Sequence, residues 1–455
     1  MKVTSEIFRA YDIRGIADKD FNKEFAYHLG KAYALSLVPG QKVSVGYDCR
    51  LTSLKYAKAL EKGLLESGLH VINIGMCPTP LLYFSIFNDN LDGGIMITGS
   101  HNPSEYNGFK ICLGKKSLHG EEIQELKKVI EKEKYRDAKG SVTKREKPIV
   151  DSYIEHLHKR FPLLLQNKDL NRNIKVVIDS GNGTAALVAP KLIKSFGFKT
   201  CELFSEVDGT FPNHHPDPSI EENLISLIHW VLEEQADVGI AYDGDADRIG
   251  VVNEGGEIIW GDTLLTLFAQ EIFKQKKSVT VIGEVKCSNS LYEVIKNMGG
   301  KAIMWKTGHS FIKDKLREEN ADIAGEMSGH IFFKDRYFGY DDALYASCRL
   351  LEILIHSNKK LSDHTKDYPK YYSTPEIRVP SDDHQKFKIV ASLKKHFSKD
   401  YPIISIDGIR IQFGDGWGLI RPSNTQPILV MRFEAKTPER LIELQNKVEA
   451  ALKTL

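Results

Sequence analysis

Cysteine is scarce in this sequence, and its placement excludes two kinds of site. The 455 residues contain six cysteines, spread along the whole chain. No two of them form a CxxC pair or share the spacing of metal ligands. The sequence therefore predicts neither a disulfide framework nor a zinc site, and it favours a reducing, cytoplasmic setting.

Long apolar runs and an excess of one charge are lacking as well. The start, "MKVTSEIFRAYDIRG", has no apolar signal-peptide core, and no apolar run reaches the roughly 20 residues of a membrane span. Lys plus Arg number 62 against 61 Asp plus Glu, so the net charge of +1 gives no bulk attraction for nucleic acid or anionic membranes. We expect no nucleic-acid or membrane partner and, because no surface signature for self-association stands out, a monomer.

What the chain does contain is a repeated pattern of strand, polar loop, helix, glycine turn and second strand. At 455 residues it is too long for one ordinary core. Three segments follow the pattern, beginning at Val43, Ile174 and Val279. Strands that alternate with helices indicate parallel α/β units, so the sequence predicts three related α/β domains with ligands at the carboxyl ends of the strands.

Changes of composition suggest the domain boundaries. A charged helix that runs into "KGSVTKREKP" indicates a boundary near residue 145. The last part of the chain has alternating strands joined by "GDGWG" and "RPSNTQP", followed by one amphipathic helix, which is typical of a smaller α+β domain. We therefore expect four domains that line a common cleft, at residues 1–145, 146–253, 254–365 and 366–455.

A run of alternate aspartates, "DGDADR", is the sharpest motif. Asp243, Asp245 and Asp247 would repel one another, and oxygen ligands at this density usually bind Mg²⁺ or Ca²⁺. An EF-hand is excluded because Arg248 occupies the position of its glycine and because strand-like segments flank the run. A guanidinium beside a metal site points to phosphate, since the two together neutralise phosphoryl charge.

Ser100 lies in "ITGSHNPSEYNGFK", just past the expected end of a strand. The surrounding residues do not form the G-x-S-x-G elbow of hydrolases, and "GNGTAALVAP" lacks the lysine of a Walker A loop. One interpretation is an ordinary turn, because serine, asparagine and proline are common turn residues. The other, suggested by the aspartate triplet, is a serine whose oxygen carries a phosphoryl group and contacts the same metal.

Two further loops carry polar groups suited to a sugar phosphate. In "GEMSGH", Glu326 and Ser328 stand at alternate positions and would point the same way if the loop is extended, facing adjacent sugar hydroxyls. The turn "RPSNTQP" supplies phosphate donors, namely Arg421, Ser423, Asn424 and Thr425. A glycine-rich hairpin and a plain polar turn are the structural alternatives.

Taken together and in this order, "YDIRG", "TGSHNP", "NGFK", "DGDADR", "KTGHS", "GEMSGH" and "RPSNTQP" resemble the α-D-phosphohexomutase superfamily, and most closely its bacterial phosphomannomutase/phosphoglucomutase group. The resemblance covers nearly the whole chain. It implies three related α/β domains and a C-terminal α+β domain of the TATA-box-binding-protein-like type around a central cleft.

The resemblance also implies an activity. Phosphate would move reversibly between O1 and O6 of a mannose or glucose phosphate, with Ser100 as the phosphate carrier and glucose 1,6-bisphosphate or mannose 1,6-bisphosphate as intermediate and activator. Mg²⁺ would be held by phosphorylated Ser100 and the three aspartates. By the same resemblance, Glu326 and Ser328 would bind O3 and O4 of the sugar, and the "RPSNT" turn would bind the phosphate that is not reacting.

The remaining site residues follow from the same resemblance. Lys110 and His309 are the candidates for proton transfer. Other residues are expected near the phosphoserine or the substrate, namely Tyr11, Arg14, His101, Arg248, Lys286 and His330. A lysine among cations could have its pKa lowered enough to accept a hydroxyl proton, but the sequence does not show which neighbours it has.

Three alternatives stay open at this point. "GEMSGH" and "TGSHNP" resemble the mannose/glucose group, whereas phosphoglucosamine mutases usually have Gln at position 327 and "TASHNP" at the serine. A phosphoserine-dependent sugar phosphatase would result if water replaced the sugar hydroxyl, but the intact "RPSNT" turn favours a mutase. A non-catalytic sugar-phosphate-binding protein is disfavoured because Ser100, the aspartates and Arg248 are all present.

Overall fold

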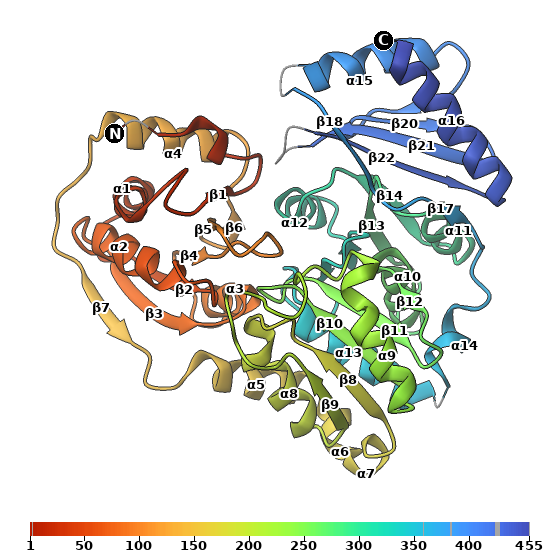
Figure 1. The fold of residues 1–455 in the computed structure, drawn as a ribbon. Helices are drawn as coiled ribbons and strands as arrows, with labels where there is room; N and C mark the ends of the chain where they lie inside the picture. The colour runs from red at the N-terminus through yellow and green to blue at the C-terminus, as the bar shows by residue number, and fades with distance from the viewer. Residues whose placement is uncertain (2, 358, 383–384, 424–427, 455) are drawn as a thin grey trace. The chain divides into compact units, whose positions relative to one another are not determined.

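The structure, a computed structural model, describes every residue except 2, 358, 383–384, 424–427 and 455 (Figure 1). The chain forms two compact units, each built from two segments. Unit 1 comprises Met1–Leu264 and Ser328–Lys366, and unit 2 comprises Leu265–Met327 and Asp367–Leu455. No helix among the described residues combines the length and apolar character needed to cross a membrane.

The three predicted repeats are present as strand–helix–strand units with parallel strands. In the first, β2 (Lys42–Tyr47), α2 (Ser53–Leu65) and β3 (His70–Met76) follow one another. The second consists of β8 (Lys175–Asp179), α8 (Ala189–Ser195) and β9 (Lys199–Leu203). The third consists of β13 (Thr280–Glu284), α11 (Asn289–Asn297) and β14 (Lys301–Trp305). Three related α/β cores, as predicted, are therefore confirmed.

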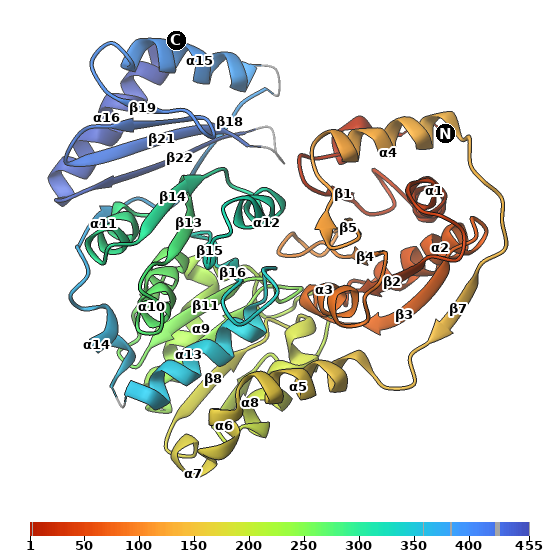
Figure 2. The same ribbon diagram turned by 180° about the vertical axis from the view of Figure 1, so that it is seen from behind.

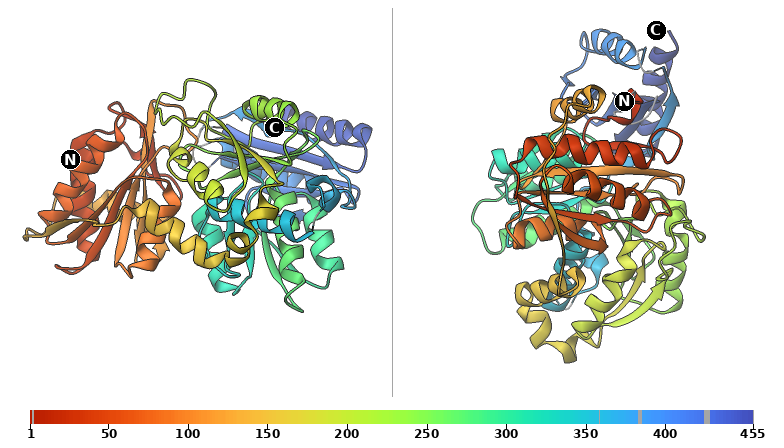
Figure 3. Two further views of the ribbon diagram at one scale, coloured as in Figure 1. Left: turned by 90° about the horizontal axis from the view of Figure 1, so that it is seen from below. Right: turned by 90° about the vertical axis from the view of Figure 1, so that its left-hand side faces the viewer.

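The first sheet of unit 1 has the order β1-β5-β4-β2-β3-β7, with β6 paired to β5. Its other strands are β1 (Ile13–Ile16), β4 (Gly93–Ile97), β5 (Tyr106–Leu113), β6 (Lys116–Ser117) and β7 (Ser141–Lys144). Helices α1 (Lys23–Tyr33) and α2 lie side by side, while α3 (Thr79–Asn88) packs on β2 and β4 and α4 (Glu121–Lys132) contacts α1 (Figures 1 and 3). Their apolar faces bury a core of Ile, Leu, Val and aromatic side chains.

The second sheet of unit 1 has the order β12-β11-β10-β8-β9. Its remaining strands are β10 (Val238–Tyr242), β11 (Ile249–Asn253) and β12 (Ile258–Ile259). The helices of this region are α5 (Ile149–Arg160), α6 (Pro162–Gln166), α7 (Lys168–Asn171) and α9 (Ile225–Glu233). Later in the chain, β16 (Ile331–Phe333), α13 (Ala343–Ser357) and α14 (Leu361–Thr365) also belong to unit 1, and α13 packs on β11.

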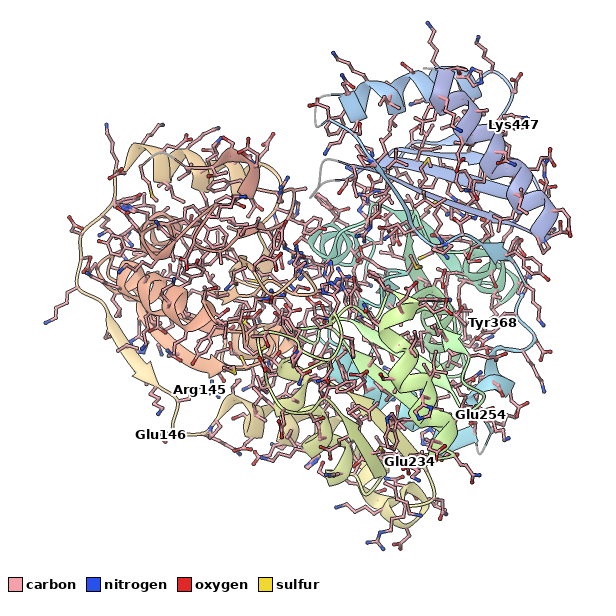
Figure 4. All side chains as sticks on the ribbon, viewed as in Figure 1. Arg145, Glu146, Glu234, Glu254, Tyr368 and Lys447 are labelled. Carbon is pink, nitrogen blue, oxygen red and sulfur yellow. The ribbon has the colours of Figure 1, made fainter. Side chains whose placement is uncertain are left out.

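Three hydrogen bonds lie close to the point where the chain leaves unit 1 for unit 2. Glu254, in the turn after β11, accepts hydrogen bonds from the backbone and side chain of Ser362 (Figure 4). A few residues on, the Tyr368 hydroxyl donates to Gln270 of α10 (Gly261–Phe273) over 2.6 Å. The segment up to α14 is thus tied to the second sheet, and the segment after it to unit 2.

Unit 2 contains a parallel three-strand arrangement and the C-terminal sheet. In the former, β13 lies between β14 and β15 (Ile323–Gly325), and α12 (His309–Glu318) packs on β13 and β15. The C-terminal sheet has the order β17-β22-β21-β20-β19, with β18 paired to β22. Its strands are β17 (Tyr372–Ser373), β18 (Ile377–Pro380), β19 (Ile403–Ile404), β20 (Ile409–Gln412), β21 (Gly416–Pro422) and β22 (Ile428–Ala435).

Helices α15 (Gln385–Phe397) and α16 (Pro438–Thr454) pack on the central strands of this C-terminal sheet (Figure 2). The sequence predicts the last helix and the alternating strands, but it does not identify α15. The described residues form four sheets, and the predicted class of three α/β domains and a smaller α+β domain is confirmed. The expectation that loops of all four domains line one cleft stays a prediction.

Two buried arginines of the C-terminal sheet hold the loop after β13. Arg410, fully buried on β20, donates to the carbonyl oxygens of Val285 and Cys287 over 2.8 and 3.1 Å. Arg432 on β22 donates to the carbonyl oxygen of Lys286, between them, over 2.6 Å. Three consecutive carbonyl groups therefore receive a charged donor each, which satisfies buried backbone acceptors.

Candidate active site

Ser100 lies in a sharp turn directly after β4. Its φ of 50° lies in the left-handed region, which is uncommon for a residue with a side chain. Its backbone N–H donates to the Thr98 hydroxyl over 2.8 Å, and its Oγ donates to Asp243 Oδ2 over 2.9 Å. The serine is 2% exposed. The loop is thus a turn, as one interpretation of the sequence has it, and its serine hydroxyl is buried against a carboxylate, as the other interpretation requires.

The aspartate run connects β10 and β11, as the flanking strand patterns predict. These strands are antiparallel, with Tyr242 opposite Ile249, so the six residues between them form a hairpin loop. Asp243 fixes the loop through Oδ1, which accepts the backbone N–H groups of Asp247 and Arg248 over 3.1 and 3.2 Å. Gly244 packs against Ser100, where a Cβ would meet the Ser100 carbonyl oxygen at 2.5 Å. The serine loop and the aspartate loop thus pack so closely that residue 244 has no room for a side chain.

Three buried carboxylates in this loop fit a divalent cation. Asp243, Asp245 and Asp247 each offer an oxygen, and these oxygens lie within 4.8 Å of one another. Among the described residues, Asp245 Oδ1 and Asp247 Oδ1 are buried without a hydrogen-bond donor. A buried acceptor without a donor is costly, and a hard cation such as Mg²⁺ is the partner that carboxylate oxygens prefer. The donor set therefore matches the predicted metal.

Lys110 lies on β5 among these carboxylates. Its ammonium group donates to Asp245 Oδ2 over 2.8 Å and also to Asp247. Burial lowers the pKa of Lys110, but the surrounding aspartates outweigh burial and raise the pKa above its ordinary value. The sequence does not show which groups surround Lys110; in the structure they are carboxylates, and they hold the lysine protonated.

The acidic groups respond to the same surroundings in opposite ways. Burial, with repulsion from Asp245 and Asp247, raises the pKa of Asp243 well above its ordinary value. Although burial also acts on Asp245, the Lys110 ammonium and its hydrogen bond lower the pKa of that carboxyl. The cluster therefore holds one firmly ionised carboxylate and others whose charge needs a further cation.

Other predicted residues surround Ser100 in unit 1. Arg14 on β1 donates to Asn102 Oδ1 over 2.7 Å and to Asp12 over 2.5 Å, and Tyr11 is partly exposed just before them. His101 Nδ1 lies 3.3 Å from Ser100 Oγ. Burial, together with the positive charges of Arg248 and Arg14, lowers the pKa of His101 well below its ordinary value. The imidazole beside the serine is therefore neutral.

Arg248 and His330 meet on the other side of the aspartate loop. Arg248 Nε donates to His330 Nε2 over 3.0 Å, and an isolated backbone bridge joins the same two residues. His330 Nδ1 lies 3.2 Å from Asp341 Oδ2 and 3.5 Å from Asp247 Oδ1. The histidine of "GEMSGH" thus belongs with the aspartate loop.

Lys286 follows β13 in unit 2 and is buried between carboxylates. Its ammonium group lies 3.3 Å from Glu376 Oε2 and 3.9 Å from Glu284 Oε1. Burial lowers the pKa of Lys286, but Glu376 and Glu284 more than offset burial and raise it. The fixed positive charge suits a phosphate ligand.

The loops "KTGHS" and "GEMSGH" are joined through acidic side chains. Glu326 Oε1 accepts the Gly308 N–H over 2.6 Å, and Glu284 Oε2 accepts the Thr307 hydroxyl over 2.8 Å. His309, buried next to Gly308, begins α12. The chain turns at residues 327–328 instead of continuing extended, so the argument that Glu326 and Ser328 point the same way does not apply. Glu326 lies in unit 2 and Ser328 in unit 1.

Arg421, at the end of β21, is held by Asp407. Its Nε and Nη2 both lie 3.0 Å from Asp407 Oδ2, which also accepts the Thr307 N–H over 3.2 Å. Ser423 is buried, and its carbonyl oxygen accepts a hydrogen bond from Lys386 over 2.7 Å. Asn424 and Thr425 lie outside the described residues. Unit 2 therefore brings Arg421 together with the "KTGHS" loop through one carboxylate.

Several residues of these sites do not stand out in the sequence analysis. Thr79 and Thr98 donate their hydroxyls to Asp245 Oδ2 over 2.6 and 3.1 Å. Asp341 contacts His330, and Asp407 and Glu376 hold the cations of unit 2. Single threonines and carboxylates carry no motif, so the only available signal is their position at the ends of strands and helices.

A serine hydrogen-bonded to one carboxylate of a triplet that fits a cation is suited to phosphoryl transfer. The four-domain fold is that of the phosphohexomutases. Sequence models of the phosphoglucomutase/phosphomannomutase family match all four parts of the chain. Its alpha/beta/alpha domains I, II and III match residues 5–137, 151–256 and 260–372, and its C-terminal domain matches residues 376–451. The chain belongs to this family.

Individual relatives agree with this assignment. A phosphoglucomutase of Neisseria gonorrhoeae is 45% identical over 99% of this chain and 98% of its own length. A phosphomannomutase/phosphoglucomutase of Pseudomonas aeruginosa is 42% identical over 99% of this chain and 96% of its own. The crystal structure of a family protein from Burkholderia thailandensis superimposes with a TM-score of 0.90 at 39% identity, covering 100% of this chain and 98% of that one.

Proposed function

We propose that this protein is a phosphomannomutase/phosphoglucomutase that interconverts the 1- and 6-phosphates of glucose and of mannose. The observation that carries the proposal is the buried hydrogen bond from Ser100 Oγ to Asp243, inside a carboxylate triplet suited to Mg²⁺. A serine hydroxyl in this position can carry a phosphoryl group whose charge a bound cation would neutralise. The bacterial relatives named above, similar over almost their full length, support the same activity.

In the proposed reaction Ser100 carries the phosphoryl group. The bond from phosphorus to Ser100 Oγ breaks as a bond to the free hydroxyl oxygen of the sugar phosphate forms. The proton that this hydroxyl loses is balanced by the proton that Ser100 Oγ gains. The resulting hexose 1,6-bisphosphate reverses its orientation and returns its other phosphate to Ser100. Each transfer conserves the phosphoryl group, so no outside oxidant or nucleotide is required.

The residues of unit 1 would stabilise the charge that moves in each transfer. Asp243, Asp245 and Asp247 would hold Mg²⁺, which supplies charge neutralisation at the phosphoryl oxygens when bound. Lys110 is a cation close to the same site. His309 stays our candidate for accepting the hydroxyl proton, and Lys110, which the aspartates hold protonated, stays a candidate as a proton donor. His101, a neutral base 3.3 Å from Ser100 Oγ, orients the serine.

Unit 2 would bind the part of the substrate that is not reacting. Lys286 and Arg421 supply fixed cations for the distal phosphate, and Glu326 supplies an acceptor for sugar hydroxyls. Ser423, Asn424 and Thr425 of the same unit are proposed to add hydroxyl and amide donors, and Ser328 of unit 1 a further hydroxyl. A clamp of this kind accepts the intermediate in either orientation, because it grips groups that the two orientations share.

A coupled assay tests this proposal. Purified protein with Mg²⁺ and a trace of glucose 1,6-bisphosphate is given glucose 1-phosphate, mannose 1-phosphate and glucosamine 1-phosphate in parallel. We expect comparable rates on the first two and a much slower rate on the third. Inactivity on all three sugars would reject a mutase, preference for the amino sugar would indicate a phosphoglucosamine mutase, and release of inorganic phosphate would indicate a phosphatase.

A further inference from the structure

Arg50 places its guanidinium group against the loop that carries Ser100. It follows β2 by three residues and is buried. Its Nη2 donates to the carbonyl oxygens of Ser100, over 2.8 Å, and of Asn102. Its Nη1 donates to the carbonyl oxygens of Tyr106, over 2.9 Å, and of Pro103. Four carbonyl groups of one short loop thus converge on one side chain.

The remaining donor of Arg50 is used as well. Its Nε donates to Asp48 Oδ2 over 3.2 Å, and the same oxygen accepts the Gly99 N–H over 3.1 Å. A guanidinium group has five N–H donors in a fixed plane, and here every one has an acceptor. Asp48 and Arg50 together therefore hold the loop on both sides of the position where Ser100 turns into the left-handed region.

Packing closes the space around the guanidinium group. A Cβ on Gly99 would lie 2.4 Å from Arg50 Nε and 2.5 Å from its Cζ, so residue 99 must lack a side chain while Arg50 is in place. The Phe211 ring centroid lies 5.1 Å from Arg50 Cζ, at the distance of a cation–π contact. The arginine has no room to change its position without moving the loop.

We propose that Arg50 is a positioning residue that fixes the Ser100 loop for phosphoryl transfer, an inference that rests on the proposed function. Arg50 acts through the backbone and does not touch the substrate. Ser100 Oγ must stay in line with the acceptor hydroxyl and beside the aspartate triplet, and displacement of a reacting atom by about 1 Å can cost about 100-fold in rate.

The lysine variant provides the first test. Arg50→Lys keeps the charge but offers three donors from a single point, so it cannot serve four carbonyl groups and Asp48 together. We expect kcat to fall about 100-fold while KM for glucose 1-phosphate changes less than about threefold. Phosphorylation of Ser100 by glucose 1,6-bisphosphate, followed by intact mass, should slow by the same factor as kcat.

Arg349 provides the matched control. It has the same exposed fraction as Arg50, 3%, and donates to the carbonyl oxygen and the carboxylate of Asp335. It lies on α13, and its described contacts include no residue of the Ser100 loop. Arg349→Lys therefore reports the cost of changing a buried arginine. We expect it to lower the melting temperature as much as Arg50→Lys and to leave kcat within about threefold of the wild type.

A second variant disturbs Arg50 without replacing it. Gly99→Ala forces the guanidinium group away from its acceptors, and the φ of Gly99 does not lie in the left-handed region, so alanine fits the backbone. The same fall in kcat is expected. In the double variant the two losses should not add, because both remove one set of hydrogen bonds.

Hydrogen exchange of residues 98–106 separates this inference from the proposed function. Faster exchange there in Arg50→Lys, and not in Arg349→Lys, supports the positioning role even if the wild type proves inactive on every sugar phosphate, which would reject the mutase alone. An active wild type with normal kcat in both Arg50→Lys and Gly99→Ala would overturn the inference. Unchanged exchange of the loop would overturn it as well.

Discussion

The two units use buried carboxylates for different purposes. In unit 1, Asp243, Asp245 and Asp247 face one another, and two of their oxygens have no donor among the described residues. In unit 2, the described contacts give each site carboxylate its own donor: Glu326 has Gly308 N–H, Asp407 has Arg421, and Glu376 has Lys286. In the described part of unit 2, no three carboxylate, histidine or cysteine side chains lie close enough together to hold a metal ion.

This difference shows how one residue type can serve two functions. Carboxylates that converge with unpaired oxygens repel one another, and a bound cation would relieve that repulsion. Carboxylates that each meet a donor fix the positions of loops and of the lysine and arginine that would receive phosphate. Under the proposed function, unit 1 would carry out the chemistry and unit 2 would hold the substrate, and the predictions below test that division.

The largest effect is expected from Ser100→Ala in unit 1. Removing the phosphate carrier should lower kcat by at least about 1,000-fold, because alanine has no oxygen that can carry the phosphoryl group. Turnover of glucose 1-phosphate measures the loss. Ser104→Ala is the control, since Ser104 lies exposed in the same loop and should leave the rate unchanged. A near-normal rate in Ser100→Ala would show that Ser100 is not the phosphate carrier.

Metal dependence should follow the carboxylates of unit 1 and not those of unit 2. Asp247→Asn weakens the open triplet, so Mg²⁺ at 100 times its dissociation constant should no longer add the roughly 2.7 kcal/mol of stability expected for the wild type. Asp407→Asn, in unit 2, should keep that stabilisation. Thermal unfolding with and without Mg²⁺ measures both, and chelation should stop wild-type turnover until Mg²⁺ is restored. Equal responses in the two variants would contradict the division.

The repeated secondary structure and the aspartate motif can be predicted from the sequence better than the side-chain contacts of the site. The strand–helix–strand repeats follow from local apolar periodicity, and the aspartate run from its spacing, so both could be found directly. The partners of Lys110 could not, because they depend on where β5 lies relative to the loop after β10. Arg50 in "GYDCR" was equally hidden, since an arginine that serves five acceptors looks like any other until the fold is known.

A change of pH should test the paired carboxylates of unit 2. Burial acts against ionisation of Glu376, but Lys286, Arg378 and Arg421 lower its pKa to about 2. A depressed folded-state pKa means that this carboxyl stabilises the protein above the unfolded value near 4.5, and that the contribution is lost as the pH falls toward 2. Glu376→Gln should therefore cost about 3 kcal/mol at neutral pH and flatten the acid limb of the stability curve.

Thermal or denaturant unfolding between pH 7 and pH 2 measures the effect of Glu376→Gln. The exposed Glu439→Gln, on α16, is the control and should unfold like the wild type at every pH. A Glu376 variant with an unchanged acid limb would show that this carboxylate does not hold Lys286 as the structure indicates.

The smallest effect is expected from Glu326→Gln, which tests substrate holding itself. The amide keeps the size of the side chain but loses the charge that accepts the Gly308 N–H and, as proposed, a sugar hydroxyl. Hydrogen bonds to a charged group contribute about 1.5–3 kcal/mol, so KM for glucose 1-phosphate should rise about 10- to 100-fold. Because Ser100 and the aspartates are untouched, kcat should fall less than KM rises. The exposed Glu318→Gln, on α12, should change neither constant. A fall in kcat alone would place Glu326 in the chemical step and would contradict the proposed division of roles between the two units.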